Sequence, residues 1–336
     1  MKDLRNYSLL HHNTFGIDAR CRRFVEIETV EEAQRLPSML KAEDRPLMVI
    51  GGGSNLLLTK DFEGTVLHAA IRGTEANVAD DGSVLLRVGS GETWDDIVAL
   101  CVERGWYGAE NLSLIPGEVG ATAVQNIGAY GAEVASIIYN VEAVEIATGR
   151  LVSFRPHECG YGYRQSRFKQ EWHGQYLITH VTYRLQTTFV PHLDYGNLRE
   201  RFTASSQKPT SQALRQAIID IRREKLPDPS VEGNAGSFFV NPVVSREKSE
   251  ELLHDYPAMP HYDAEGKVKI PAGWLIEQCG WKGRSLGRAG VHGRQALVLV
   301  NRGGATGADI VALCEAIRHD VKEKFGIDIH PEVNIV

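Results

Sequence analysis

Residues 233–239 read Gly-Asn-Ala-Gly-Ser-Phe-Phe, so four small residues lead to one hydroxyl group and then to two aromatic rings. Glycine allows backbone dihedrals that other residues avoid and lets a bound molecule approach the backbone closely. The two phenylalanines can anchor the following segment in a core, which would hold Ser237 at a wall. The same pattern is also typical of a glycine-rich turn before a strand. This stretch alone does not decide between a binding wall and a turn.

The composition narrows the class of protein. The chain has 336 residues, of which 43% are hydrophobic, so we expect two or three packed domains. A net charge of −6 and an isoelectric point near 6.1 argue against binding nucleic acid or an anionic membrane, because both need basic patches. No apolar run approaches the roughly 18 residues that a membrane-spanning helix needs. We expect a soluble, unexported protein with a small-molecule partner.

The cysteines and histidines carry no motif. Five scattered cysteines form no CxxC pair, so we expect reduced thiols in a cytoplasmic protein. Cys101 and Cys314 lie in helical apolar patterns, where cysteine packs as a small hydrophobic residue. The histidines show no metal-ligand spacing such as HExxH, so we expect no metal.

A second glycine-rich stretch, Gly51-Gly52-Gly53-Ser54-Asn55, lies between two apolar runs. It can expose consecutive amides as an anion nest that admits a diphosphate, or it can be a tight turn between strands. Leu56 stands where a GxGxxG motif needs its third glycine, and the chain has no GxxxxGK[ST] motif, so a dinucleotide-binding fold of the usual kind is disfavoured. The small residues of 114–121 and 125–131 suit a wall against a flat cofactor or a cluster of close-packed turns. Their position relative to the loop at 51–55 would decide between a cofactor wall and a cluster of turns.

The periodicity predicts a mixture of helices and short strands. Two prolines, Pro227 and Pro229, mark a boundary before the last third of the chain. The alternation at 331–336 predicts a strand that returns to the preceding domain. We expect helices over 93–104, 211–222, 273–279 and 306–325, and strands over 46–50, 141–146, 176–185, 238–244 and 296–300.

Three polar side chains stand out. Arg164, in a run of tyrosines and cations, could hold a carboxylate in a bidentate fork, or could belong to a solvated basic face. Glu332 follows a proline in an apolar segment, so it is either at a strand mouth, partly buried with a raised pKa, or a surface residue. Ser237 lacks the GxSxG context of a hydrolase, because Phe239 stands where that motif has glycine.

Together these segments resemble the UDP-N-acetylenolpyruvoylglucosamine reductase family over nearly the whole chain. Residues 194–198 resemble the tyrosine-bearing loop of the family's longer form. The segments that carry the resemblance are Asn13-Thr14-Phe15, Gly51–Asn55, Ile115–Gly131, Tyr163–Ser166, Lys225-Leu226-Pro227, Gly233–Phe239 and Pro331-Glu332-Val333.

The resemblance implies an α+β, three-domain flavoprotein with a two-part FAD-binding unit, similar to vanillyl-alcohol oxidase and PCMH, and a separate α+β substrate domain. The implied domains are FAD-binding subdomain 1 (1–70), FAD-binding subdomain 2 (71–225 with 327–336) and the substrate domain (226–326). The implied FAD-binding residues are Gly51, Gly52, Gly53, Ser54, Asn55, Ile115, Pro116, Gly117, Gly120, Ala121, Gln125, Asn126, Ile127, Gly128, Ala129 and Tyr130.

The resemblance also implies a reaction. NADPH reduces the flavin and leaves, and the reduced flavin gives a hydride to the enolpyruvyl methylene carbon of UDP-N-acetylglucosamine enolpyruvate, which becomes UDP-N-acetylmuramate for bacterial peptidoglycan. Arg164 and Glu332, the acid expected in its protonated form, polarise the substrate carboxylate, and Ser237 delivers a proton to the other carbon. Tyr195, Lys225, Asn241 and Gln295 match positions around the substrate.

One position departs from the family pattern. Val240 stands where relatives often carry lysine, and Lys225 or Lys282 could take over its phosphate contact. We expect a monomer in the bacterial cytoplasm. Two other hypotheses stay open: an oxidase of the same architecture that passes electrons to oxygen, and a sugar-nucleotide binding protein without catalysis.

Overall fold

The computed structural model describes residues 1–194, 198–203 and 209–336, with only the backbone of residue 203. The chain forms two compact units, which we describe separately. Unit 1 comprises Met1–Tyr7, Cys21–Gly52 and Glu63–Arg222, and unit 2 comprises Ser8–Arg20, Gly53–Phe62 and Arg223–Val336. Among the described residues, no helix has both the length and the apolar character needed to cross a bilayer.

The first sheet of unit 1 has four strands in the order β1-β2-β5-β3. β3 and β5 run parallel, and the last residue of β3, Ile50, pairs with His68. The two short helices contribute Ala33 and Leu36 to a core with Val25 and Leu67. The elements are β1 (Lys2–Ser8), β2 (Arg20–Ile27), α1 (Val30–Gln34), α2 (Leu36–Met39), β3 (Leu47–Ile50) and β5 (Phe62–Ala69).

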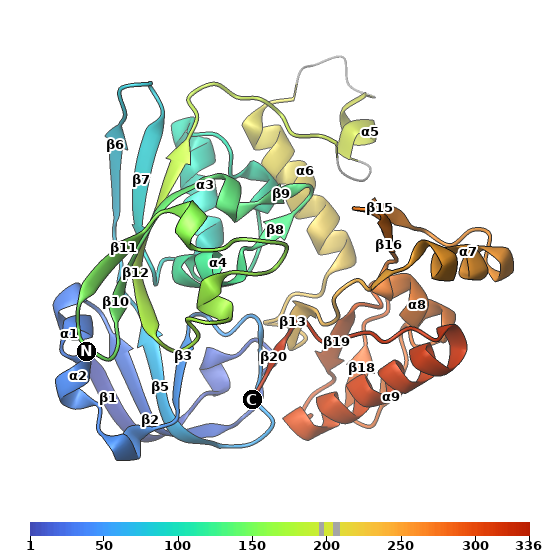
Figure 1. The fold of residues 1–336 in the computed structure, drawn as a ribbon, viewed down its shortest axis with the longest axis horizontal. Coiled ribbons are helices and arrows are strands. Elements are labelled where there is room, and N and C mark those ends of the chain that lie inside the picture. Colours follow the sequence, from blue (N-terminus) through green and yellow to red (C-terminus); the bar gives the residue numbers. More distant parts are fainter. Residues whose placement is uncertain (195–197, 204–208) are drawn as a thin grey trace. The chain divides into compact units, whose positions relative to one another are not determined.

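The second sheet of unit 1 is antiparallel, with the order β11-β10-β12-β7-β6. Helices α3 and α4 lie against it (Figure 1), and Trp94 and Ile97 of α3 join Val119 of α4 in its core. The elements are β6 (Thr74–Val78), β7 (Val84–Gly89), α3 (Trp94–Arg104), α4 (Val119–Gln125), β10 (Ile138–Glu145), β11 (Leu151–Phe154) and β12 (Tyr176–Leu185).

A small hairpin and two helices complete this part of the chain. The hairpin pairs Gly128 with Glu133. The apolar stripe of α6, including Leu214 and Ile218, packs on Leu198 of α5. The elements are β8 (Gly128–Ala129), β9 (Ala132–Glu133), α5 (Leu198–Thr203) and α6 (Ser211–Lys225), with 3-10 helices η2 (Ala42–Asp44), η3 (Glu110–Leu112), η4 (Val134–Ser136), η5 (Pro156–Glu158) and η6 (Arg167–Lys169).

Unit 2 is built on an antiparallel sheet with the order β13-β19-β18-β17. The long helix α9 packs along this sheet, and α8 packs on α9 (Figure 1). Its elements are η1 (Leu10–His12), β4 (Leu56–Leu57), β13 (Asn234–Ser237), β14 (Val243–Val244), α7 (Arg246–Asp255), β15 (Tyr262–Ala264), β16 (Lys267–Lys269), α8 (Ala272–Gln278), β17 (Ser285–Leu286), β18 (Ala289–Val291), β19 (Val298–Asn301), α9 (Gly307–Phe325) and β20 (Asn334–Ile335).

The predicted helices are present, and their ends follow the capping rules. Gly105 closes α3 in the left-handed conformation, with φ of 71°. Thr306 and Asp309 form a capping box at the start of α9. The strand predicted over 238–244 is wrong in extent, because β13 ends at Ser237 and β14 begins only at Val243. Pro242 lies in that gap and cannot donate a backbone hydrogen bond to a sheet.

Candidate functional site

The glycine loop, Gly51–Asn55, begins in unit 1 directly after β3 and packs there against the second small-residue segment. A Cβ atom at Gly52 would lie 3.4 Å from the Cα of Gly117. A Cβ atom at Gly51 would lie 3.2 Å from the Cβ of Ala121 and 3.3 Å from Oε2 of Glu118. The structure therefore brings together two segments that the sequence analysis left as either a cofactor wall or separate turns, and their small residues permit the close approach.

The rest of the glycine loop belongs to unit 2. Gly53 has φ of 66°, and a Cβ atom there would overlap the carbonyl oxygen of His12. The side chain of Asn55 donates to the carbonyl of Glu332 at 3.4 Å, and the carbonyl of Asn55 accepts from Asn334 at 3.2 Å. These bonds connect a predicted cofactor residue to a predicted catalytic residue within one unit.

The third predicted cofactor segment, Gln125–Tyr130, joins the end of α4 to the β8–β9 hairpin. Asn126 takes the left-handed conformation with φ of 44°, and its side chain is fully buried. That side chain donates to Glu133 and to the carbonyl of Gly162, both at 2.8 Å, and accepts from Ala135. The Asn126 side chain therefore holds the hairpin and the Arg164 segment in place, while its backbone N–H donates to the carbonyl of Thr122.

Arg164 is half-buried and lies over this hairpin. Its Nη2 donates to the carbonyl of Gly128 at 2.7 Å, and its guanidinium carbon is 5.6 Å from the ring centre of Tyr163. Arg164 has φ of 56°, a conformation that is strained for residues other than glycine. By contrast, Arg167 pairs with Glu171 at 2.7 Å and is exposed. The alternative of a uniformly solvated basic face therefore fits Arg167 but not Arg164.

Ser237 and Glu332 lie on adjacent segments of unit 2. Ser237 ends β13 opposite Val298 of β19, and its side chain is exposed. The next residue, Phe238, is buried, and its carbonyl accepts from the backbone N–H of Glu332 at 2.8 Å. Phe239 is also buried and bridges Pro331. The two phenylalanines hold the exposed hydroxyl against a packed wall beside the half-buried Glu332, which supports the wall interpretation of this stretch.

Two of the four predicted substrate residues lie close together in the structure, and the other two do not join them in the described residues. Asn241 accepts from the N–H of Ala272 at 2.9 Å, and a Cβ atom at Gly273 would lie 3.3 Å from Oε1 of Gln295, so both side chains lie at the start of α8. Lys225 is exposed at the end of α6. Tyr195 lies outside the described residues.

Of the two lysines expected to compensate for Val240, Lys282 already forms an ion pair within the protein. The Nζ atom of Lys282 is 2.9 Å from Oε1 of Glu277 in unit 2. The backbone N–H of Val240 donates to the carbonyl of His330 at 2.9 Å, which aligns this segment with the chain just before Glu332.

Comparison with known proteins places this arrangement in a family. A model of the UDP-N-acetylenolpyruvoylglucosamine reductase C-terminal domain matches residues 228–336, and a model of an FAD binding domain matches residues 21–155. UDP-N-acetylenolpyruvoylglucosamine reductase of Bacteroides fragilis (strain YCH46) is 54% identical over 333 residues, which cover 99% of both chains. The protein of that name from Porphyromonas gingivalis (strain ATCC BAA-308 / W83) is 48% identical over 99% of both chains.

The chain belongs to the UDP-N-acetylenolpyruvoylglucosamine reductase family. The crystal structure of UDP-N-acetylenolpyruvylglucosamine reductase from Thermus caldophilus has the same fold, with a TM-score of 0.68 and 21% identity over 99% of this chain and 98% of that one. The expected α+β flavoprotein fold and the expected FAD-dependent oxidoreductase are confirmed.

The residues present fit an FAD molecule. The matched FAD binding domain contains Gly51, Gly52 and all of residues 115–130. Within unit 1, Gly51 and Gly52 pack against Ala121 and Gly117, and the carbonyl of Gly128 accepts a hydrogen bond from Arg164. Segments of such small residues let a flat ring system and a diphosphate approach the backbone.

Sequence reasoning missed three charged residues that contact these segments or belong to them: His68, which is buried, and Glu118 and Arg222, which are half-buried. His68 of β5 contacts Glu118, and Nε of Arg222 donates to the carbonyl of Leu114 at 3.2 Å. Burial lowers the pKa of Arg222, although Tyr130 and Asp95 act against that shift. Each contact joins residues 50 or 108 positions apart, so no local pattern in the sequence reveals it.

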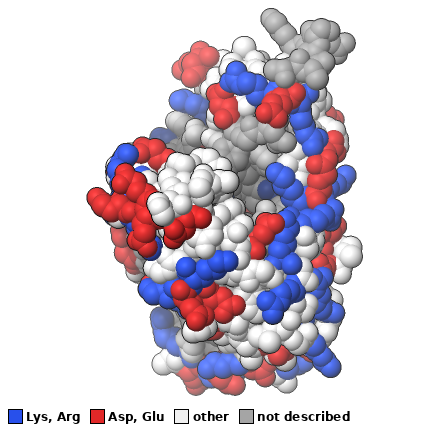
Figure 2. Space-filling view, turned by 90° about the vertical axis from the view of Figure 1, so that its right-hand side faces the viewer, with Lys and Arg blue, Asp and Glu red and all other residues white. Residues whose placement is uncertain are grey.

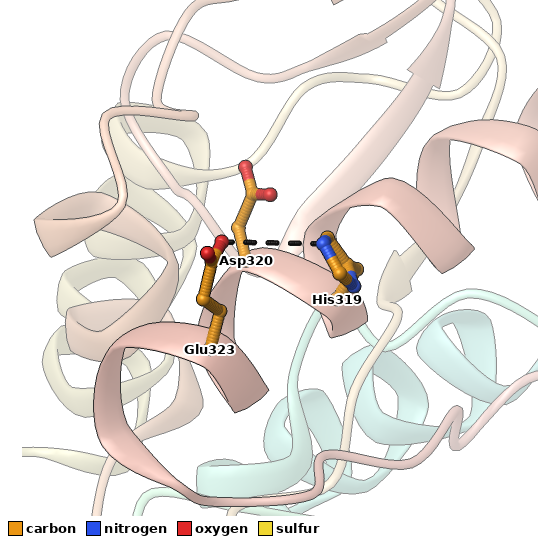
Figure 3. Close-up of side chains that lie close together, drawn as sticks. All are labelled: His319, Asp320 and Glu323. Carbon is orange, nitrogen blue, oxygen red and sulfur yellow. Dashed lines mark ion pairs between the residues drawn. The ribbon is translucent and has the colours of Figure 1, made fainter.

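Among the described residues, His319, Asp320 and Glu323 of α9 are the group of ligand-type side chains close enough to share a metal ion. Figure 3 shows His319 and Glu323 facing one another along the helix, with 3.9 Å between Nε2 and Oε2. Asp320 accepts from the indole N–H of Trp281 at 2.8 Å. An exposed helix pair and a hydrogen-bonded carboxylate account for this group without an ion.

The buried cysteines behave as expected from their helical patterns. Cys101 of α3 and Cys314 of α9 are both buried. Burial raises the pKa of each thiol to about 12, so neither forms the reactive thiolate near neutral pH.

Proposed function

We propose that this chain reduces UDP-N-acetylglucosamine enolpyruvate to UDP-N-acetylmuramate, a precursor of bacterial peptidoglycan, with NADPH as hydride donor and FAD as cofactor. The observation that carries the proposal is the 54% identity to a named reductase over 99% of the chain, together with both family models. The substrate is a small UDP-sugar. Bound FAD supplies a carrier that accepts a hydride from NADPH and passes it to the enolpyruvyl group.

The residues that hold FAD are, in this proposal, the backbone groups of the glycine loop and of residues 115–130. Support comes from the contacts between Gly51, Gly52 and the segment from Gly117 to Ala121. The glycines leave the peptide N–H groups uncovered by side chains, which is what an anionic diphosphate requires. Ser54 and Asn55 extend the same loop toward the backbone of Glu332.

Ser237 is the proton donor in this proposal. Hydride addition to the methylene carbon builds negative charge at the neighbouring carbon, and that carbon must then receive a proton. A serine hydroxyl is a weak acid, so it must be held at the reacting carbon and resupplied with protons from solvent. The exposed side chain of Ser237, next to two buried phenylalanines that anchor the segment, supports this role.

Arg164 and Glu332 bind the substrate carboxylate in this proposal. A planar guanidinium can donate two parallel hydrogen bonds to a carboxylate. Its charge also stabilises the enolate that forms during hydride addition. Glu332 is proposed to contact the same group, as the family resemblance implies. Asn241, Gln295, Lys225 and Tyr195 are proposed to contact the rest of the sugar nucleotide.

The remaining organisation is proposed from the family pattern. The three-part division into residues 1–70, 71–225 with 327–336, and 226–326 follows the segments that would hold FAD and substrate. A cytoplasmic location fits a reaction that draws on NADPH. A monomer is proposed, with no nucleic-acid or membrane partner, and on the face shown in Figure 2 acidic side chains lie among the basic ones.

The test is an anaerobic absorbance spectrum of the purified protein at three stages. We expect a flavin band that bleaches when NADPH is added and returns when UDP-N-acetylglucosamine enolpyruvate is added, with one UDP-N-acetylmuramate formed per flavin. A band that returns only when oxygen is admitted would instead identify an oxidase. Nucleotide binding without any bleaching, even after FAD is supplied, would identify a binding protein without catalysis.

A further inference from the structure

A line of alternating charges runs through unit 1 to the underside of the glycine loop. His68 is 7% exposed, and its two ring nitrogens each face a carboxylate. Nδ1 is 3.1 Å from Oε2 of Glu26 on β2, and Nε2 is 3.0 Å from Oε2 of Glu118. Glu26 is also paired with the ammonium of Lys2 at 2.5 Å. The sequence of charges from Lys2 to Glu118 is therefore positive, negative, positive, negative.

This geometry favours a protonated histidine. A carboxylate can only accept hydrogen bonds, so both ring nitrogens of His68 must donate, and only the imidazolium form has two donors. Burial by itself would lower the pKa of His68, but the hydrogen bonds and charges of Glu118 and Glu26 outweigh it, and the pKa lies above the ordinary 6.5. The ring also lies near that of Phe24 on β2, with ring centres 6.2 Å apart.

Glu118 connects this line of charges to the proposed FAD surface. It follows Gly117, and its side chain lies under the first two glycines of the loop. A Cβ atom at Gly51 would lie 3.3 Å from Oε2 of Glu118, and a Cβ atom at Gly52 would lie 3.7 Å from Cγ of Glu118. His68 itself pairs with Ile50, the residue before Gly51, on the neighbouring strand in Figure 1. A negative charge thus lies beneath a loop proposed to receive the anionic FAD.

We propose that His68 is a positioning residue that, when protonated, neutralises Glu118 beneath the glycine loop, so that the affinity of this chain for FAD falls as the pH rises. The proposal rests on the proposed FAD site. When His68 loses its proton, one ring nitrogen presents a lone pair to a carboxylate, and the charge of Glu118 is no longer balanced. That charge repels the FAD diphosphate, and the side chain that supports Gly51 and Gly52 loses its hydrogen bond.

The test is titration of FAD into the full chain freed of its cofactor, followed by flavin fluorescence, from about pH 6 to pH 9, the range in which histidine changes charge. For the unchanged chain we expect the FAD dissociation constant to rise roughly tenfold across the transition, which lies above pH 6.5. His68→Gln removes the positive charge beside Glu118, so this variant should bind FAD weakly at every pH. Glu118→Gln removes the charge, so it should bind FAD tightly at every pH.

The opposite effects of these two variants separate charge balance from simple packing. If His68 and Glu118 mattered only for packing, both variants would weaken FAD binding alike, and that result would overturn the proposal. His180→Gln is the matched control, because His180 is 8% exposed and lies 3.8 Å from Glu142, in the other sheet of unit 1. It should keep the pH dependence of the unchanged chain.

The outcomes also separate this inference from the proposed function. If the unchanged chain binds FAD with the same affinity at every pH, His68 does not act in this way, although the FAD site stands. If it binds no FAD at any pH, the proposed function fails and the inference falls with it. Should His68→Gln not fold, the pH profiles of the unchanged chain and of Glu118→Gln decide by themselves.

Discussion

Two regions of the molecule use small residues for opposite purposes. In unit 1, Gly51, Gly52 and Gly120 pack closely against other protein groups on the side of the missing Cβ, since a Cβ atom at any of them would lie between 2.9 and 3.4 Å from a neighbour. In unit 2, Gly236 has φ of 70° and open space where its Cβ would be, and Ser237 beside it is exposed. The first region is a surface made of backbone, and the second presents one side chain. Substitutions should therefore damage folding and cofactor binding together in the first region, and chemistry alone in the second.

Ser237→Ala tests the second region and should have the largest effect. Product formation should fall roughly 10²–10⁴-fold, the usual contribution of a positioned proton donor. Reduction of the flavin by NADPH should persist, because only the protonation step loses a group. Stopped-flow absorbance measures the two half-reactions separately.

The control for this variant is Ser285→Ala, an exposed serine on β17 at the opposite edge of the same sheet. It should leave both half-reactions unchanged. Equal losses in the two half-reactions of Ser237→Ala would contradict the role of proton donor, and a large drop in its melting temperature would contradict the contrast between the regions.

Arg164→Lys tests a residue that contacts the backbone of the first region, at Gly128, and is proposed to bind the substrate. Lysine cannot form the bidentate fork, so the second half-reaction should slow by roughly 100-fold. Arg167→Lys, on a residue already paired with Glu171, should have no effect on the rate. A second half-reaction of normal rate in Arg164→Lys would remove Arg164 from the proposed carboxylate site.

Gly120→Val tests the first region. Gly120 lies in α4 and packs against Ser90, the residue that follows β7. A Cβ atom at Gly120 would be 2.9 Å from the Cβ of Ser90. We expect a loss of about 2 kcal/mol in the free energy of unfolding, with weaker FAD binding in parallel. Thermal unfolding and FAD titration measure both. Gly293→Val, at an exposed glycine with open space around it, is the comparison for stability.

The smallest expected effect concerns Asp95, which holds the start of the small-residue segment of the first region. Asp95 of α3 accepts from the N–H of Leu114, which begins the small-residue segment, and from Arg215 of α6 at 2.7 Å. Burial raises the pKa of Asp95, but the hydrogen bonds from Arg215 and Leu114 outweigh it, and the pKa lies below its ordinary value. The ionised carboxylate therefore stabilises the fold above the unfolded-state pKa of about 3.9, and this contribution is lost as the pH falls through the lower folded-state value.

Asp95→Asn should accordingly lower the free energy of unfolding by about 1–2 kcal/mol at pH 7, and by less below about pH 4. Urea unfolding, followed by the fluorescence of the adjacent Trp94, measures the difference. Asp96→Asn, at the exposed neighbouring residue, should show no such pH-dependent difference. A deficit of Asp95→Asn that is constant from pH 7 to pH 3 would mean that the charge of Asp95 is not the source of its stabilisation.

The helices were predictable because their signals are local. The apolar spacing of Ile97, Val98 and Cys101 and the stop at Gly105 define α3 within one segment, and the structure has that helix. The strand predicted over 238–244 was too long because the run of β-formers outweighed Pro242 in the pattern. The line of charges from Lys2 to Glu118 could not be predicted, since its four residues come from four segments spread over 117 positions of the chain.

By itself, the sequence predicted which residues take part in the chemistry: the hydroxyl of Ser237 before two phenylalanines, the guanidinium of Arg164, the acid of Glu332 and two glycine-rich stretches. Those are properties of residue type and of neighbours along the chain. Only the tertiary structure decided that Gly52 lies against Gly117, that the Asn126 side chain holds a hairpin, and that His68 lies between Glu26 and Glu118. The reason is physical: close packing and charge pairing depend on distance in space, and the fold brings these groups together from segments that share no local pattern.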